Sequence, residues 1–339
     1  MRNLYLLIFI ISLQSCGSKT INSQLDSLTT GSETATEYAN TITKSDLSKL
    51  LYRLASDEFQ GRETGKLGQK KAADYLKNFY IQHKIASPYG GSDYFQSIPT
   101  EHLRPKLNPS ENVVAFIEGS EKPDEIVVIS AHYDHLGMYD GKIYYGADDD
   151  GSGNVAILEI AEAFQKAVLE GNGPKRSILF LHVTGEEKGL LGSKYYTNFP
   201  IFPLENTIAN LNIDMIGRVD DLHQENPNFV YLIGSDKLST ELHKLSEEIN
   251  EKFTQLELDY TYNNEDDPNR YYYRSDHYNF AKNNIPIIFY FNGTHEDYHK
   301  PSDTPDKINY DVLTKRTQLI FYTAWEIANR EDRIKVDKK

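Results

Sequence analysis

Apolar and polar positions form blocks along the chain from about residue 41, and the lengths of these blocks are typical of both helices and strands. Apolar residues recur at helical spacing in the longer blocks, whereas the shorter blocks are continuous apolar runs of the kind found in buried strands. The pattern predicts helices over 45–54, 66–80, 154–169, 190–199, 239–253 and 312–328. It predicts strands over 112–117, 125–131, 177–183, 208–213, 229–233 and 285–291. Because strands alternate with helices, we expect an α/β fold, a three-layer sandwich with a central mixed, mostly parallel β-sheet flanked by helices.

The N-terminal residues follow a different pattern. Arg2 precedes an apolar run over 4–13 that is too short to span a bilayer and has the length of a signal-peptide core. The run leads into L-Q-S-C, which resembles a bacterial lipobox and ends at Cys16, the single cysteine of the chain. We therefore expect 1–15 to be a signal peptide and Cys16 to carry a lipid anchor on the periplasmic or cell-surface side of a bacterial membrane. The alternative is an ordinary secretory signal followed by an unrelated cysteine.

Composition limits the domain organisation, the classes of partner and the kinds of active site that the chain can have. Residues 16–40 are rich in Ser, Thr, Gly and Asn, which predicts a flexible, lipid-anchored tether, and a single domain is expected over 41–335. The net charge of -14 argues against a nucleic-acid partner and against binding to anionic lipid, so membrane attachment is expected only through the anchor. The lack of any other cysteine excludes thiolate metal sites and a cysteine nucleophile.

Polar side chains follow the predicted strands at their carboxyl ends, where open α/β sheets place their sites. The strand over 125–131 runs directly into His132, and Asp134 comes two residues later. This spacing fits a metal ligand and a carboxylate that accepts the other N–H of its ring. A purely structural pair would have the same spacing.

An acidic loop, G-A-D-D-D-G-S-G over 146–153, opens the predicted helix at 154. The three adjacent carboxylates repel one another, and a bound divalent cation would relieve that repulsion. A calcium loop or an acidic helix start would explain the same pattern.

Four more candidate residues follow later strands. Glu186 and Glu187 come after the strand over 177–183, Asp214 follows the strand over 208–213, and His299 lies in a polar loop after the last strand. One of two adjacent glutamates can bind a metal ion while the other takes a proton from a metal-activated water. Nitrogen and oxygen ligands without sulfur suit zinc, with manganese or cobalt as substitutes. A set of five such ligands, one of them a carboxylate able to bridge, fits two metal ions about 3.5–4 Å apart.

These motifs together resemble metallopeptidase family 28, the co-catalytic zinc aminopeptidases that include bacterial leucyl aminopeptidases. The resemblance covers about 45–328. It rests on S-A-H-Y-D at 130–134, the loop at 146–153, G-E-E-K-G-L-L-G-S at 185–193, N-I-D-M at 212–215 and H-K-P-S-D-T from His299. It implies the zinc-dependent exopeptidase fold, two zinc ions per chain and peptide substrates with a free N-terminus.

The resemblance also implies a role for each motif residue. It assigns His132 and Asp214 to the first zinc, Glu187 and His299 to the second, and Asp149 to both as the bridging ligand, with a cis peptide between Asp149 and Asp150. Asp148 stays open as an alternative bridging residue. Glu186 is implied as the general base, and Asp134 as the residue that orients His132.

Other parts of the chain carry weaker expectations. Asp276 and His277 resemble family sequence near the cleft and are candidate substrate contacts, with a structural loop as the alternative. Residues 56–62 resemble a family segment that packs near the site in a structural role. We expect His135 to be a satisfied or exposed histidine rather than a further ligand, and the same holds for His182 and His295.

Several other functions remain open on the same fold. They are a glutaminyl cyclase-like enzyme with a single zinc, a specialised carboxypeptidase or dipeptidase, and a non-catalytic binding module. The complete five-ligand set argues against the cyclase and against the module, because either would be expected to lose ligands or the base.

Overall fold

The structure is a computed structural model in which residues 33–338 are described. The expected signal peptide and Cys16 lie outside the described residues. The chain divides into two units, 1–37 and 38–339, and the second contains every strand found in the described residues. Residues 33–39 are helical, and Tyr38 is fully buried with its ring 5.6 Å from that of Trp325. The second unit starts at Tyr38, and residues 33–39 of the expected tether are helical.

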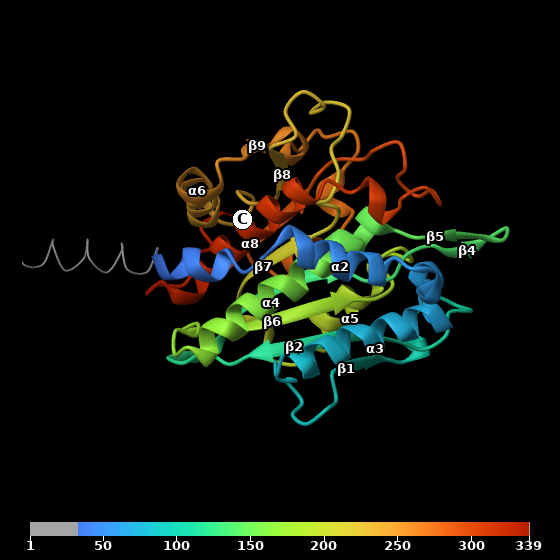
Figure 1. Cartoon of the computed structure of the whole chain (residues 1–339). Helices are drawn as coiled ribbons and strands as arrows, with labels where there is room; N and C mark the ends of the chain where they lie inside the picture. Colours follow the sequence, from blue (N-terminus) through green and yellow to red (C-terminus); the bar gives the residue numbers. More distant parts are fainter. Residues whose placement is uncertain (1–32, 339) are drawn as a thin grey trace, which may run out of the picture. The chain divides into compact units, whose positions relative to one another are not determined.

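A mixed eight-stranded sheet forms the centre of the second unit, in the order β1-β2-β6-β3-β7-β10-β8-β9 (Figure 1). Its strands are β1 (Phe95–Ile98), β2 (Ser110–Ile117), β3 (Lys122–His132), β6 (Arg176–Val183), β7 (Thr207–Ile213), β8 (Phe229–Ile233), β9 (Glu257–Asp259) and β10 (Ile287–Phe291). The inner strands β6, β3, β7 and β10 run parallel, and antiparallel strands flank them. The expected mixed, mostly parallel sheet is confirmed.

Burial on both faces explains why the inner strands are rich in apolar residues, although β7 also contains the buried Asn210 and Asn212. Every residue of β6, β7 and β10 is buried, as is the second half of β3. The register places His132 opposite Val183, the last residue of β6, and Tyr290 of β10 opposite Ile213, the last residue of β7. The carboxyl ends of these parallel strands consequently meet at one edge of the sheet.

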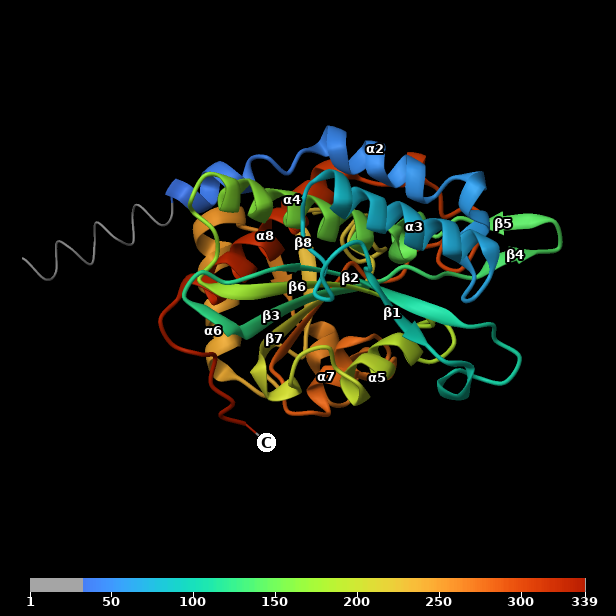
Figure 2. The ribbon, with the colours of Figure 1, turned by 90° about the horizontal axis from the view of Figure 1, so that it is seen from below.

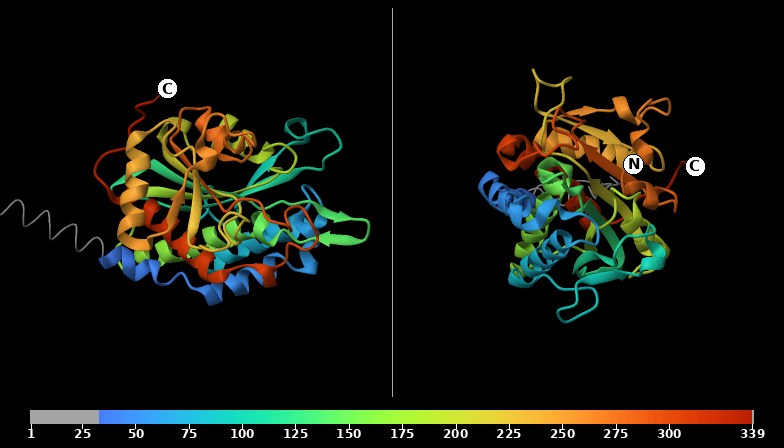
Figure 3. Two further views of the ribbon diagram at one scale, coloured as in Figure 1. Left: turned by 90° about the horizontal axis from the view of Figure 1, so that it is seen from above. Right: turned by 90° about the vertical axis from the view of Figure 1, so that its right-hand side faces the viewer.

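Helices cover both faces of the sheet, which completes the expected sandwich (Figure 2). On one face lie α2 (Lys44–Leu54), α3 (Leu67–Gln82), α4 (Gly153–Leu169) and α8 (Tyr310–Asn329), and on the other lie α5 (Leu191–Asn198) and α7 (His277–Ala281). A further helix is α6 (Thr240–Ile249). A two-stranded hairpin, β4 (Gly137–Tyr139) and β5 (Lys142–Tyr144), extends away from the sheet (Figures 1 and 3). None of the helices within the described residues has the length and apolar composition needed to cross a membrane.

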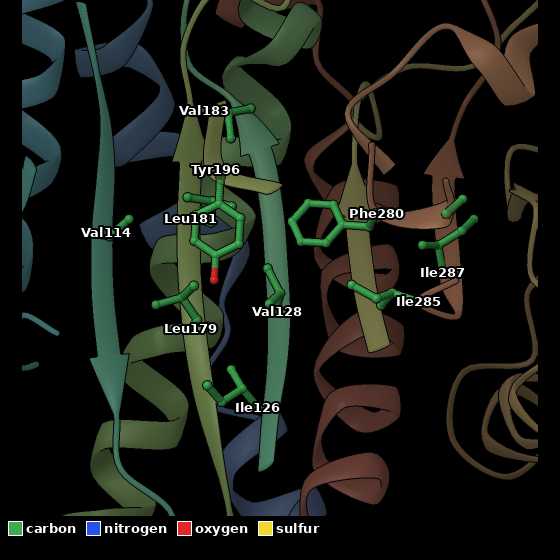
Figure 4. Close-up of a cluster of buried hydrophobic side chains, with 11 residues drawn as sticks. Val114, Ile126, Val128, Leu179, Leu181, Val183, Tyr196, Phe280, Ile285 and Ile287 are labelled. Carbon is green, nitrogen blue, oxygen red and sulfur yellow. The ribbon is translucent and has the colours of Figure 1, made fainter. Parts of the chain in front are cut away.

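One apolar cluster joins the sheet to the layer formed by α5 and α7 (Figure 4). Val128, Leu179 and Leu181 project from the strands toward Tyr196 of α5 and Phe280 of α7. Each of these side chains is almost fully buried, which contributes about 1.5–3 kcal/mol per large apolar side chain. The packing holds the inner strands, and therefore their carboxyl ends, in fixed relation to one another.

The apolar pattern did not predict several short and edge elements, among them β1, β9, the hairpin β4–β5 and the five-residue helix α7. The last inner strand also begins at Ile287 rather than at residue 285. Pro286 precedes it and has no N–H to donate, although its carbonyl accepts the N–H of Asn210 at 2.9 Å. The helix expected over 239–253 ends at Ile249 and continues as a wider turn over Asn250–Thr254.

Candidate metal centre

The candidate residues come together at the carboxyl edge of the inner strands. His132 is the last residue of β3, and Asp214 directly follows β7. Glu187 follows β6, and His299 lies between β10 and α8. Asp149 lies in the turn Ala147–Ser152 that opens α4, and its peptide bond to Asp150 is cis, as the resemblance implied.

A first cluster forms around His132. Its Nε2 lies 3.1 Å from Asp149 Oδ1 and 3.5 Å from Asp214 Oδ1. Asn154, in the first turn of α4, donates one hydrogen bond to the carbonyl of His132 and another to that of Asp150, each at 2.6 Å. The start of α4 is thereby tied to the end of β3.

A second cluster forms around the other oxygen of Asp149. Asp149 Oδ2 lies 3.0 Å from His299 Nε2, which is itself 3.5 Å from Glu187 Oε2. On the other side of Glu187, its Oε1 lies 2.8 Å from His135 Nδ1. The Asp149 carboxylate therefore lies between the two clusters, with one oxygen turned to each.

His135 is the residue that sequence reasoning missed. It was expected to be satisfied or exposed, but it is fully buried, and neither ring nitrogen has a hydrogen-bond partner among the described residues. A signal was present in the sequence, because His135 is a second histidine three residues beyond His132 at the end of the same strand. The direction of the His135 side chain depends on the turn after β3. The periodicity of apolar residues does not reveal that direction.

The donor set fits zinc. Donor atoms about 2.0–2.2 Å from a zinc ion lie roughly 2.8–3.6 Å from one another in octahedral to tetrahedral arrangements. Both clusters have nitrogen–oxygen separations in this range, from 2.8 to 3.5 Å. Buried polar atoms are normally hydrogen-bonded. Glu187 Oε1, like both nitrogens of His135, has no such partner in the described part of the chain.

Asp134 does not orient His132 in the expected way. His132 Nδ1 lies 3.0 Å from the main-chain oxygen of Asp134 but 3.9 Å from its carboxylate oxygen Oδ1. The carboxylate instead accepts hydrogen bonds from the Thr64 hydroxyl at 2.7 Å and from the N–H of Glu186 at 3.1 Å. Asp134 thus holds His132 through its main-chain oxygen. Its side chain holds the loop that carries Glu186.

Asp148 is turned away from the two clusters. Its Oδ1 accepts the N–H of Gly217 at 2.6 Å, and its Oδ2 lies 3.1 Å from His295 Nε2. The Asp303 carboxylate accepts the main-chain N–H groups of Asp148 and Asp149 at 3.0–3.1 Å and so fixes the turn. Only Asp149 presents its carboxylate to both clusters.

The two adjacent glutamates have opposite electrostatic environments. Burial, reinforced by the carboxylate of Asp214, raises the pKa of Glu186 well above its usual value. Burial would also raise the pKa of Glu187, but its close contacts with His135 and His299 lower it to about 2. Groups whose pKa values are pushed apart in this way are typical of sites that divide proton transfer from charge stabilisation.

Asp276 and His277, the two weaker candidates, are both fully buried at the start of α7. The Asp276 carboxylate accepts a hydrogen bond from Ser193, and burial raises its pKa to about 7. His277 Nε2 donates to the carbonyl of Tyr272 at 2.8 Å, and burial lowers the pKa of His277 to about 3. Each of the two residues keeps one buried polar atom without a hydrogen-bond partner among the described residues, namely Oδ2 of Asp276 and Nδ1 of His277.

Arg62 shows what the segment over 56–62 does. Its buried guanidinium donates hydrogen bonds to the carbonyls of Leu54, Tyr133, Tyr145 and Gly146 at 2.7–3.3 Å. Two of these carbonyls border the metal-site turns at 132–135 and 146–150. One side chain therefore holds the turn after β3 against the turn before α4.

Comparisons with known proteins show the family of this chain and relatives that share its fold. The model of peptidase family M28 matches residues 112–324. A protein named probable leucine aminopeptidase from Arthroderma otae is 27% identical over 304 residues, with 85% of this chain and 78% of that protein covered. A vacuolar membrane protease from Verticillium alfalfae is 44% identical over 85 residues, 25% of this chain, and this chain spans only 8% of that protein.

Solved structures share the fold. The LapA aminopeptidase of Legionella pneumophila superposes with a TM-score of 0.69 at 22% identity, covering 89% of this chain and 76% of that one. The glutaminyl cyclase of Porphyromonas gingivalis superposes with a TM-score of 0.64 at 17% identity, covering 83% of this chain and 97% of that one. At these identities the likeness establishes the fold alone.

Proposed function

Because the chain belongs to peptidase family M28, we propose that it is a zinc-dependent aminopeptidase that hydrolyses the N-terminal peptide bond of peptides. The observation that carries this proposal is the Asp149 carboxylate. One of its oxygens lies 3.1 Å from His132 Nε2, and the other lies 3.0 Å from His299 Nε2. A carboxylate shared between two clusters of histidine and carboxylate ligands is what a pair of co-catalytic metal ions requires.

Five residues would hold two zinc ions in this proposal. His132 and Asp214 belong to the first ion, Glu187 and His299 to the second, and Asp149 to both. When bound, zinc supplies a lowered pKa for an attacking water and polarises the scissile carbonyl.

Glu186 is the proposed general base. The Asp134 carboxylate accepts its main-chain N–H, which fixes the loop that carries it beside Asp214. The raised pKa of the buried Glu186 side chain favours uptake of a proton from the attacking water. Glu186 can then pass that proton to the leaving amine, so that one residue serves both halves of the reaction.

The test of the proposed activity uses zinc-loaded protein and a panel of aminoacyl anilides, each beside its N-acetylated form. We expect cleavage of the free-amine compounds only, abolished by a chelator and restored by zinc. Cleavage of the acetylated compounds, or of neither set, would contradict an aminopeptidase. The panel also reports which N-terminal side chain the enzyme prefers.

The role of Glu186 has its own test. Glu186→Ala and Glu186→Gln should keep the zinc content of the parent protein and lose about 10²–10⁴-fold in kcat, the usual contribution of a general base. Full turnover in either variant would remove Glu186 from this role.

A glutaminyl cyclase on the same fold is the nearest alternative. It would require a single zinc and the cyclisation of peptides that begin with glutamine. Zinc counting distinguishes the two enzymes, because the presence of both clusters around Asp149 leads us to expect two zinc ions per chain. A specialised carboxypeptidase or dipeptidase would instead reveal itself by cleaving only substrates with a particular terminus.

We propose that the protein is lipid-anchored through Cys16, which lies outside the described residues. The proposal rests on the L-Q-S-C sequence after the apolar run at 4–13. Mass spectrometry of the mature N-terminus should find an acylated cysteine, and Cys16→Ser should move the protein from the membrane fraction to the soluble fraction. An unmodified mature terminus at another residue would contradict the anchor.

A further inference from the structure

The second metal cluster contains a sixth candidate donor, and this observation is independent of the five-residue set. His135 Nδ1 lies 2.8 Å from Glu187 Oε1 and 3.7 Å from Asp149 Oδ2. His135, Asp149 and Glu187 form one of the two groups of side chains in the described residues that could hold a metal ion, and the other group is His132, Asp149 and Asp214. The ring of His135 also lies 5.9 Å from the ring of His299, centre to centre.

The contact between His135 and Glu187 is close, yet it is not a hydrogen bond. The two atoms are 2.8 Å apart, but the angles do not meet hydrogen-bond geometry, and both atoms lack any other hydrogen-bond partner among the described residues. Two donor atoms that point at a common third position, rather than at each other, have this geometry. Both ring nitrogens of His135 and Oε1 of Glu187 are therefore buried without a partner among the described residues. Burying such polar atoms costs free energy of folding unless a ligand binds them.

The backbone holds His135 in place for this role. Its main-chain N–H donates to the carbonyl of Arg62 at 3.2 Å, and an isolated bridge pairs it with Glu63. The imidazole packs against the backbone of Gly146, where an added Cβ would lie 2.6 Å from His135 Cγ. A glycine at this position, with its φ of +55°, therefore leaves room for the ring beside the turn that carries Asp149.

We propose that His135 Nδ1 is a ligand of the second zinc ion, which then has four protein donors, namely His135, Glu187, His299 and Asp149. This inference rests on the proposed metal centre. It also gives the two metal ions unequal roles. Four protein donors complete a tetrahedral shell, as in structural zinc sites, whereas three leave a position open, as in catalytic ones. The first zinc, with the three protein donors His132, Asp149 and Asp214, would then be the one that keeps an open position.

Zinc binding itself provides the test. The proteins to compare are the parent, His135→Ala, His135→Asp and the control His223→Gln. His223 is also buried, and its Nδ1 is hydrogen-bonded to the carboxylate of Asp220 at 2.8 Å, so it is a second buried histidine beside a carboxylate that lies outside both clusters. Zinc content across a series of chelator-buffered zinc concentrations gives the affinity of each of the two sites. X-ray absorption at the zinc edge counts the imidazoles bound.

We expect the parent protein to show three imidazoles shared by two zinc ions. His135→Ala should lose one imidazole and weaken one of the two zinc affinities by more than 100-fold, beyond the 10–100-fold typical of a residue that only orients a ligand. His135→Asp should recover part of that affinity through an oxygen donor, and His223→Gln should change neither measurement.

Two imidazoles in the parent protein, or an unchanged imidazole count in His135→Ala, would overturn the proposal and leave His135 as a residue that positions Glu187. The count in the parent protein decides the question even if the alanine variant does not fold. A parent protein that binds only one zinc would instead contradict the proposed co-catalytic centre, which separates the failure of the function from the failure of this inference.

Discussion

Replacing Asp134 with asparagine tests how His132 is oriented. His132 Nδ1 lies 3.0 Å from the main-chain oxygen of Asp134 and 3.9 Å from its carboxylate. Because the acceptor is a backbone atom, Asp134→Asn leaves it unchanged and should preserve the histidine tautomer that keeps Nε2 free for metal. If the carboxylate were the acceptor, the NH₂ of the new asparagine side chain could donate to His132 Nδ1 and so hold His132 in the wrong tautomer.

The cost of Asp134→Asn can be worked out from the two hydrogen bonds of the side chain. An asparagine oxygen can still accept the N–H of Glu186, and its NH₂ can donate to the Thr64 hydroxyl, which now accepts. No buried group loses its partner, so the structural cost is small. What remains is the lost negative charge close to a metal ligand, a change that typically lowers activity by about 10–100-fold. This corresponds to about 1.4–2.7 kcal/mol in the activation barrier.

The assay measures kcat and kcat/KM on the preferred aminoacyl anilide at saturating zinc, together with the zinc content of each protein. Asp134→Ala is the matched comparison, because it removes both hydrogen bonds and leaves the Glu186 N–H without its acceptor, so it should be the more damaging change. A loss of about 10⁴-fold or more in fully zinc-loaded Asp134→Asn would refute the reasoning, since that is the size of loss caused by a wrong histidine tautomer in a hydrolase site.

Three further predictions follow from the geometry. Asp149→Asn should abolish tight binding of both zinc ions. Asp148→Asn should keep both zinc ions and lower the free energy of unfolding by about 1–3 kcal/mol. Equal zinc loss in the two variants would contradict the assignment of Asp149 as the bridging residue. Arg62→Ala removes the guanidinium hydrogen bonds to four carbonyls, of which that of Gly146 still accepts the N–H of Gly151, so thermal unfolding should show a loss of about 3 kcal/mol and weaker zinc retention; an unchanged melting temperature would contradict it. Burial raises the pKa of Glu159 to about 8 from 4.5, so the folded state holds a proton that the unfolded chain releases, and stability should fall as pH rises from about 4.5 to 8. Glu159→Gln should therefore raise the melting temperature at pH values above 8 but not near pH 4, and equal shifts at both would refute it.

Much of the fold could be predicted from the sequence because its central strands are buried on both faces. The strands β3, β6 and β7 are rich in apolar residues for this reason, and the helices that pair with them have apolar residues at helical spacing. The edge strands β1 and β9 are only four and three residues long, too short to establish a period. The hairpin β4–β5 has exposed residues such as Tyr139 and offers no apolar pattern to follow.

The sequence by itself determined which residue types stand at the ends of the buried strands, and therefore the zinc-type chemistry, because strand ends and ligand types are local properties. Only the tertiary structure decided which atoms meet. It turned Asp149 rather than Asp148 toward both clusters, gave His132 a backbone acceptor instead of the Asp134 carboxylate, and brought His135 to Glu187. These choices depend on the directions of turns that are held by groups distant in the chain, such as Arg62 and Asp303, and no periodicity of hydrophobic residues encodes those directions.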